Sequence, residues 1–220
     1  MVKTSAVSIA AVVALLYALF FKWYGSGGEP IDRKEAFDTL VASGAEKTVA
    51  EAMVSSLLPS DDDDGRSFLM LNLVKQRAEA SYGNRPDLKP QWVTSGRDAD
   101  QYYASQFLPK ILKRAGHPVF VSRSVARAAL MLPDGLGKDA RDAFSDWDYF
   151  ALVRYRCMRD LVDAVAELTS ELGSDAMFVL KHSGVERTYV LPIFSPAYSH
   201  AVRSGVLLFA VAAIRALSKK

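Results

Sequence analysis

The sequence has little of the chemistry from which common active sites are built. Its 220 residues include one cysteine, Cys157, so no disulfide can form within the chain and no cysteine cluster can bind a metal. The three histidines are scattered, and there is no nucleophile elbow, phosphate-binding glycine loop or zinc-binding spacing. We therefore predict neither a metal nor another cofactor, and we expect Cys157 to be a small buried residue.

Acidic residues are absent from both ends of the chain. Residues 1–24 and 201–220 contain six lysines and arginines and no Asp or Glu, whereas residues 25–200 contain 21 basic and 25 acidic side chains, a net charge of −4. A nucleic-acid-binding module would instead carry its basic residues on a face of the folded domain. The charge distribution argues against nucleic acid as a partner and favours contact of the two ends with a lipid bilayer.

The amino-terminal end is apolar over nearly the width of a bilayer. Apart from Ser8, residues 6–21 are apolar or aromatic, and no small-residue cleavage pattern of a signal peptide follows them. Because about 20 residues cross a bilayer as a helix, we predict an uncleaved transmembrane anchor over residues 1–24. Its expected membrane-contacting residues are Phe20, Phe21, Trp23 and Tyr24.

The carboxy-terminal end predicts a second apolar helix within residues 196–220. Residues 205–214 are apolar on every side, and Arg203 and Arg215 flank them. A run of about ten residues either docks on protein or at the membrane interface, or forms a second crossing with help from the arginines. The predicted contact residues are Leu207, Leu208 and Phe209. The predicted localisation is a membrane, single-pass or two-pass, and either organellar or bacterial.

Between the two ends, residues 25–65 predict a linker followed by two short helices. The run Gly25 to Gly28 is typical of a flexible linker. Asp32 can cap a helix that begins at Arg33, and a second helix fits residues 46–58.

Residues 66–195 predict one domain of alternating strands and helices. Short apolar runs bounded by turn residues indicate strands, and apolar positions at helical spacing indicate helices. The expected strands are residues 68–74, 118–122 with a companion at 125–132, 147–155 and 185–194, and the expected helices are residues 98–114 and 158–172.

This order predicts an α+β fold, the ferredoxin-like βαββαβ antiparallel sheet with both helices on one face. The strands are apolar along nearly their whole length, so the other face of the sheet must also be covered. A second copy of the domain is the simplest cover, as in a dimeric α/β barrel.

Three short motifs lie in the matching order: Met70 to Lys75, then Trp147-Asp148 with Leu152 to Tyr155, then Gly184 to Thr188. With Tyr102, Tyr103 and Gly116, they resemble a small domain-of-unknown-function family of the dimeric α/β-barrel superfamily, in a membrane-anchored version. The resemblance covers residues 66–195, and the chain departs from it in the insertions at 76–97 and 133–145, in Arg156-Cys157 and in the carboxy-terminal helix. Because the superfamily includes cofactor-free oxygenases, haem enzymes and members without known activity, the resemblance leaves the chemistry open.

Polar residues within the predicted strands define one candidate site. Asn72, Tyr103, Trp147, Arg154 and Glu186 either line a pocket between sheet and helices or form a buried polar network that fixes strand register or the dimer interface. Neither interpretation supplies a catalytic acid–base pair, so catalysis is not indicated.

Two functions remain open. The first is a membrane-anchored, non-catalytic accessory or scaffold subunit that assembles with other membrane-complex subunits. The second is a small-molecule-binding protein or cofactor-free enzyme of the dimeric barrel type that acts on an apolar substrate, and it requires an unfilled apolar cavity.

Overall fold

One antiparallel sheet organises the protein. The computed structural model describes residues 6–25, 27–58, 63–123, 146–173 and 175–194, and the side chains of residues 6–10 are outside this description. Within these ranges the strands are β1 (Phe68–Gln76), β2 (His117–Arg123), β3 (Tyr149–Tyr155) and β4 (Val185–Ile193), in the order β2-β3-β1-β4 with every neighbour antiparallel. The predicted α+β class with an antiparallel sheet is confirmed. The companion strand predicted at 125–132, the loop at 133–145 and the helix within 196–220 lie outside the described residues.

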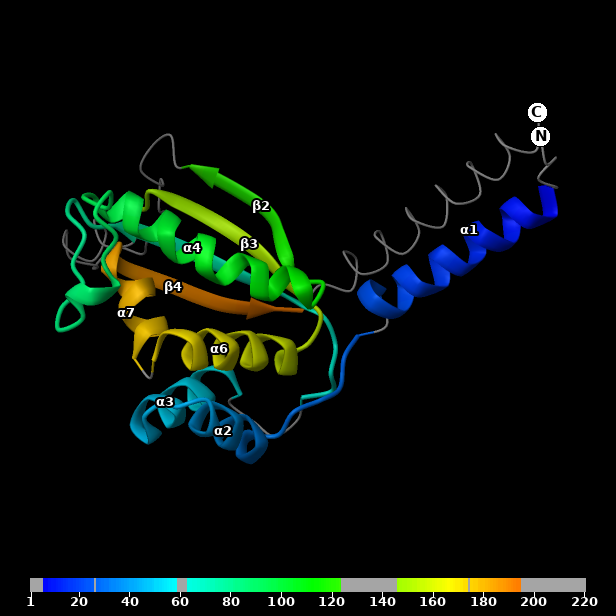
Figure 1. Cartoon of the computed structure of the whole chain (residues 1–220), viewed down its shortest axis with the longest axis horizontal. Coiled ribbons are helices and arrows are strands. Elements are labelled where there is room, and N and C mark those ends of the chain that lie inside the picture. Colours follow the sequence, from blue (N-terminus) through cyan, green and yellow to red (C-terminus); the bar gives the residue numbers. More distant parts are fainter. Residues whose placement is uncertain (1–5, 26, 59–62, 124–145, 174, 195–220) are drawn as a thin grey trace, which may run out of the picture.

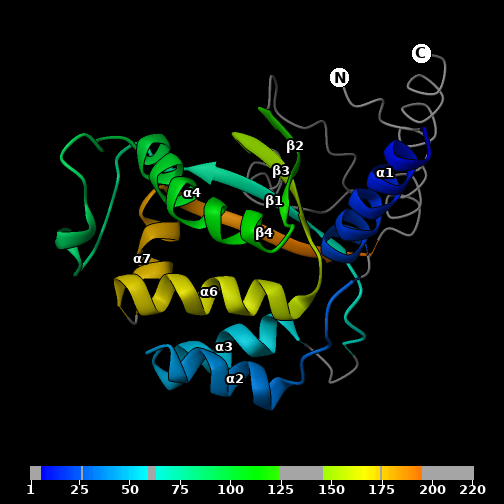
Figure 2. The ribbon, with the colours of Figure 1, turned by 45° about the vertical axis from the view of Figure 1, so that its right-hand side comes forward.

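Two long helices cover the same face of this sheet, α4 (Gly96–Lys113) after β1 and α6 (Met158–Leu172) after β3 (Figures 1 and 2). The strand register explains which side chains face them. Asn72 lies opposite Ala151, which lies opposite Val121 on β2. Because strand side chains alternate between faces, Met70, Asn72 and Val74 point toward the helices, whereas Leu71 and Leu73 point away. The bounds of α6 agree with the predicted 158–172.

A further short helix was not predicted from the sequence. Helix α7 (Ala176–Ser183) lies between α6 and β4 and packs against the amino-terminal half of α4. The long connection after β1 contains one turn of 3₁₀ helix, η2 (Pro86–Leu88). It ends in a capping box, in which Ser95 Oγ accepts from the Asp98 N–H and the Asp98 carboxylate accepts from the Ser95 N–H. These backbone hydrogen bonds hold the pKa of Asp98 at about 2 and fix the start of α4.

The two short helices predicted after the linker belong to the core of the domain. They are α2 (Arg33–Ala42) and α3 (Lys47–Leu57), and Figure 2 shows them on the side of α6 that faces away from the sheet. Leu40 and Val54 are buried in the same cluster as Leu161 and Leu168 of α6. Residues 25–65 therefore add a third layer rather than serving only as a spacer.

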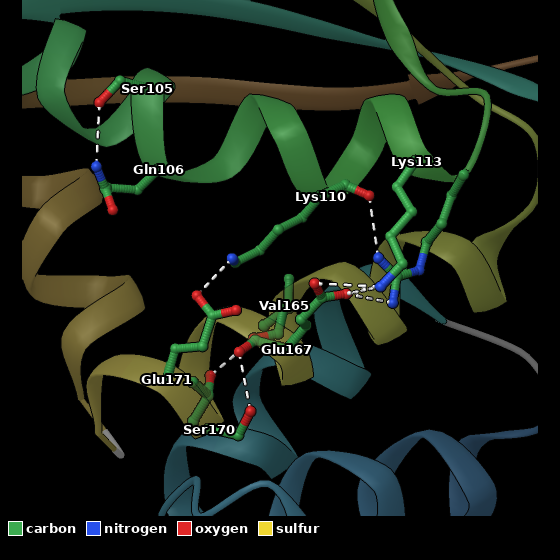
Figure 3. Close-up of polar contacts among 10 residues, drawn as sticks. Ser105, Gln106, Lys110, Lys113, Val165, Glu167, Ser170 and Glu171 are labelled. Carbon is green, nitrogen blue, oxygen red and sulfur yellow. Dashed lines mark hydrogen bonds and ion pairs between the residues drawn. The ribbon is translucent and has the colours of Figure 1, made fainter.

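Ion pairs join α4 to α6 along their outer sides (Figure 3). Lys110 Nζ lies 2.6 Å from a carboxylate oxygen of Glu171, and Glu167 pairs with both Arg114 at 2.7 Å and Lys113 at 3.3 Å. Lys110 is a buried residue with its stem between the helices, so it contributes apolar contact as well as charge. These pairs fix the spacing of the two helices above the sheet.

The predicted transmembrane anchor is not supported. Within the predicted segment, the structure describes helix α1 (Ala6–Phe20). Among the described residues, no helix is both long enough and apolar enough to cross a membrane. The predicted membrane localisation is therefore corrected.

The residues directly after α1 continue the helical run and contact the sheet domain. They form a π-helical turn, η1 (Phe21–Gly25), which brings Tyr24 back onto the sheet domain. The Tyr24 hydroxyl lies 2.7 Å from His117 Nε2, and Arg154 donates to the Tyr24 carbonyl at 2.5 Å while its guanidinium lies 3.9 Å from the centre of the Tyr24 ring. Tyr24, expected at a lipid headgroup region, is instead buried against protein. Phe20 stacks on it, with ring centres 5.1 Å apart.

Candidate functional site

A cavity of about 580 Å³ lies between the sheet and the helices that cover it. Its floor is the helix-facing side of the strands, including Met70, Val74 and Ala151. Its walls come mainly from α4 and α6, including Phe107 and Val165. A volume in this range holds a small organic molecule.

The mouth of the pocket is marked by exposed residues among those that line it. Gln101 and Ala104 on α4 are exposed, and so are Val121 and Arg123 on β2, an edge strand of the sheet. The described part of the pocket therefore opens between the first half of α4 and the edge of the sheet.

Four polar side chains gather at one end of this mainly apolar space, and further polar residues that line it are Asn72, Arg97, Gln101, Arg123, Asp148 and Thr188. Asp100 on α4 accepts a hydrogen bond from Gln76 of β1, with Nε2 and Oδ2 2.9 Å apart. Tyr149 of β3 also donates to the Asp100 carboxylate, and Lys181 of α7 lies within range of its charge. Four separate elements thus bring one carboxylate, one ammonium group, one amide and one phenol to the same end of the pocket.

Burial acts on both charged groups of this cluster in opposite directions. It raises the pKa of the Asp100 carboxyl, and the hydrogen bonds from Tyr149 and Gln76 together with the charge of Lys181 oppose the rise. Burial lowers the pKa of the Lys181 ammonium, and the charge of Asp100 opposes that fall. Burial and the charge of Asp100 raise the pKa of the Tyr149 hydroxyl, which keeps it protonated as a donor. These shifts are those of a poorly solvated site.

Two glycines allow α4 and α7 to approach closely enough to form this cluster. A side chain on Gly184, directly after α7, would collide with the Gly96 carbonyl oxygen and with the Asp100 backbone nitrogen. A side chain on Gly96, the first residue of α4, would collide with the Gly184 carbonyl oxygen and the Arg77 backbone. The absence of side chains at both positions places Asp100 and Lys181 across from each other.

Several hydrogen-bond donors that line the pocket have no partner among the described residues. Among them are the hydroxyls of Tyr103 and Tyr155 and the ammonium of Lys181. Burial raises the pKa of both phenols well above the ordinary value, so both hydroxyls keep their protons. The Tyr103 ring stacks on Phe107, with ring centres 5.7 Å apart, and this contact fixes its orientation on α4.

The structure brings only two of the five predicted site residues to the pocket. Asn72 and Tyr103 line it, and the Asn72 amide also donates to the Met70 carbonyl at 3.1 Å. Trp147 precedes β3 and lies under the guanidinium of Arg187, whereas Glu186 is exposed. Neither of these two lines the cavity.

Arg154 lies on the opposite face of the sheet because strand positions alternate. Its neighbours Val153 and Tyr155 face the helices, so Arg154 faces away. There it is buried and donates to the Ala115 carbonyl at 2.7 Å and to the Tyr24 carbonyl. Arg154 therefore does not line the pocket with Asn72, and its hydrogen bonds tie η1 and the residues just before β2 to the sheet.

The sequence analysis missed Asp100, Gln76, Tyr149 and Lys181. A signal for Asp100 was present, since it precedes Tyr103 by three residues and so shares the inward side of α4 with Tyr103 and Phe107. An acidic residue on an otherwise apolar helix face is a candidate for a site. No comparable signal existed for Lys181, because helix α7 itself was not predicted.

The fold and the site together define a mixed α+β protein that encloses an apolar pocket with a compact polar end. Among the described residues, no three His, Cys, Asp or Glu side chains are placed to hold a metal ion together. The polar end offers hydrogen-bond donors and acceptors from Gln76, Asp100, Tyr149 and Lys181.

The comparisons with known proteins leave the particular family open. No protein-family model matches the chain, and no curated protein matches it. A crystal structure of methylated RPA0582 protein is similar, with a TM-score of 0.48 and 19% identity over 67% of this chain and 93% of that chain. A second crystal structure, of the RPA0582 protein of unknown function from Rhodopseudomonas palustris, has a TM-score of 0.45 and 20% identity over 66% of this chain and 95% of that chain. Both TM-scores are below 0.5, so the function proposed below does not depend on either likeness.

Proposed function

We propose that this protein binds a small, largely apolar organic molecule in the pocket between the sheet and helices α4 and α6. The observation that carries the proposal is the cavity of about 580 Å³ with a mainly apolar lining and a cluster of polar groups at one end. A site of this composition stabilises a ligand by burying its apolar surface, and the few polar groups determine its orientation. Such a pocket is what the small-molecule hypothesis requires.

The alternative hypothesis, an accessory subunit of a membrane assembly, has lost its main support. It depended on the predicted anchor over residues 1–24, and no helix among the described residues could span a bilayer. The inserted loop at 76–97 also has a local structural role, because its end caps α4 next to the pocket. The pocket therefore favours the small-molecule alternative.

The finer fold assignment supports this proposal. The strand order β2-β3-β1-β4, with α4 and α6 as crossovers on one face, is the ferredoxin-like arrangement. On the other face, Leu71 lies between Leu152 and Leu191, and Leu73 lies between Phe150 and Tyr189. We propose that a second copy of the chain covers this apolar row, as in a dimeric α/β barrel, which would leave the ligand pocket on the helix side of each copy.

Blocking the mouth of the pocket tests the proposed function. The neutral, apolar fluorescent probe N-phenyl-1-naphthylamine should bind to the purified protein with enhanced emission. Ala104→Trp places a bulky ring at the mouth and should weaken this binding by about tenfold or more. Ser105→Trp is the matched control, because Ser105 is the next exposed residue on α4 and does not line the cavity. Equal binding by both variants would exclude this pocket as the binding site.

A further inference from the structure

The polar end of the pocket has a composition that selects among apolar ligands. Asp100 on α4 and Lys181 on α7 face this space with opposite charges, and Arg97, Arg123 and Asp148 also line the pocket. A charged ligand group placed between Asp100 and Lys181 would be attracted by one of them and repelled by the other. A ligand group without net charge is therefore favoured at that position.

The hydrogen-bonding capacity of the cluster is incomplete in a specific way. The Asp100 carboxylate accepts bonds from Gln76 and Tyr149, yet a carboxylate has about four acceptor sites. The Lys181 ammonium has three donors and makes no hydrogen bond or ion pair with another described residue. Leaving such groups unsatisfied in a poorly solvated place costs free energy, so a ligand group that satisfies both would bind with a large advantage.

The aromatic side chains add a preference for a flat ligand. Tyr103, Phe107, Tyr149 and Tyr155 all line the cavity, from α4 and from β3. Ring faces and edges pack well against another planar ring system. The inward hydroxyls of Tyr103 and Tyr155 provide further donors to an oxygen on the ligand.

From this arrangement we infer that the ligand is an aromatic compound with an uncharged hydroxyl group between Asp100 and Lys181 at the polar end of the pocket. The hydroxyl donates to the Asp100 carboxylate, and its oxygen accepts from the Lys181 ammonium. A ligand carboxylate in that place would be repelled by the Asp100 carboxylate, and a ligand ammonium would be repelled by the Lys181 ammonium. An ether oxygen could accept a hydrogen bond from Lys181 but could not donate one to Asp100. The inference depends on the proposed function, because it assigns the ligand class of the same pocket.

Three naphthalene derivatives separate the possibilities: 2-naphthol, 2-methoxynaphthalene and 2-naphthoate. Their binding to the full-length protein can be measured by calorimetry or by ligand fluorescence. We expect 2-naphthol to bind at least about tenfold more tightly than the methyl ether, since a hydrogen bond to a charged acceptor contributes this much or more. The naphthoate should bind more weakly than 2-naphthol.

Two pairs of variants assign the preference to the two side chains. Asp100→Leu and Lys181→Met should each reduce the 2-naphthol preference about tenfold while leaving the affinity for the methyl ether nearly unchanged. Asp163→Asn is the control for Asp100, because burial also raises the pKa of that carboxyl on α6 but it does not line the pocket. Lys110→Met is the control for Lys181, because it removes a buried lysine that pairs with Glu171 on the outer side of the helices. If Asp100→Leu does not fold, Asp100→Asn replaces it as the test variant. The preference for 2-naphthol should then fall by less, because the asparagine amide oxygen is an uncharged acceptor.

The outcomes distinguish the inference from the proposed function. Three results would overturn the assignment of a hydroxylated ligand. They are equal affinity for 2-naphthol and its methyl ether, tighter binding of the naphthoate than of 2-naphthol, and a preference for 2-naphthol that survives in both Asp100→Leu and Lys181→Met. In each of these cases binding itself would remain. Absence of binding by all three compounds, together with absence of binding by the fluorescent probe, would overturn the proposed function as well.

Discussion

Replacing Ala151 by leucine should fill part of the pocket and stabilise the folded protein. Ala151 lies in the middle of β3, 8% exposed, and its methyl group forms part of the cavity floor between Asn72 and Val121. Leucine adds three carbon atoms, and burying each one in an apolar environment contributes about 0.8 kcal/mol, so the free energy of unfolding should rise by up to about 2 kcal/mol. The same side chain occupies space that a ligand would need, so binding of N-phenyl-1-naphthylamine should fall.

Urea denaturation followed by far-ultraviolet circular dichroism measures the free energy of unfolding of each variant. The matched control is Ala164→Leu, at a fully buried alanine of α6 that belongs to the packed core and does not line the cavity. Overpacking a filled core costs about 1–3 kcal/mol, so this control should be destabilised. If Ala151→Leu is destabilised to the same extent, the space above β3 is already filled and the reasoning for a ligand pocket is refuted.

Four further results are expected. Because burial raises the pKa of Asp100, its contribution to stability is present below the ordinary carboxyl pKa of 3.8 and is lost as the pH rises through the higher folded value; Asp100→Asn should therefore gain stability relative to the wild type in urea titrations as the pH is raised across this window. Gly184→Ala should destabilise the protein by about 1–3 kcal/mol, because its methyl group meets the backbone of α4. It should also weaken 2-naphthol binding more than does a substitution outside the pocket that lowers the free energy of unfolding by the same amount. Glu167→Gln should cost about 1 kcal/mol near neutral pH, and the difference from the wild type should shrink as the pH falls through the lowered pKa of Glu167, since its stabilising pairs with Arg114 and Lys113 are then lost in the wild type as well. Leu191→Lys on the outer face of the sheet should convert a dimer to a monomer in sedimentation equilibrium without reducing probe binding, and a wild type that sediments as a monomer would refute the proposed dimer.

The element order was predictable because it depends on local patterns. The amphipathic spacing of Met158, Leu161, Val165 and Leu168 predicted a helix with the bounds observed for α6, and the apolar runs bounded by turn residues predicted all four strands of the sheet. Asp32 was expected to cap α2, and it accepts from the Glu35 N–H at 2.7 Å. In each case the residues that decide the element are close together in the sequence.

The errors arose where distant contacts outweigh a local pattern. The run from Ala6 to Phe21 is apolar enough to predict a transmembrane helix, but Tyr24 in the π-helix that follows contacts His117 and Arg154, far away in the sequence. Nothing near Tyr24 in the sequence indicates those contacts. Arg154 was assigned to the pocket for a related reason, since a strand pattern does not by itself tell which face of the sheet the helices cover.

The sequence by itself determined the α+β class and the order of strands and helices, because these depend on periodicity and composition over short stretches. Only the tertiary structure decided which polar residues meet. The cluster of Gln76, Asp100, Tyr149 and Lys181 comes from four elements, and it forms because the sheet register and the close approach of Gly96 and Gly184 bring them to one end of the cavity. A pocket is space that side chains leave unfilled, so it depends on the packing of all the surrounding elements and has no local signature in the sequence.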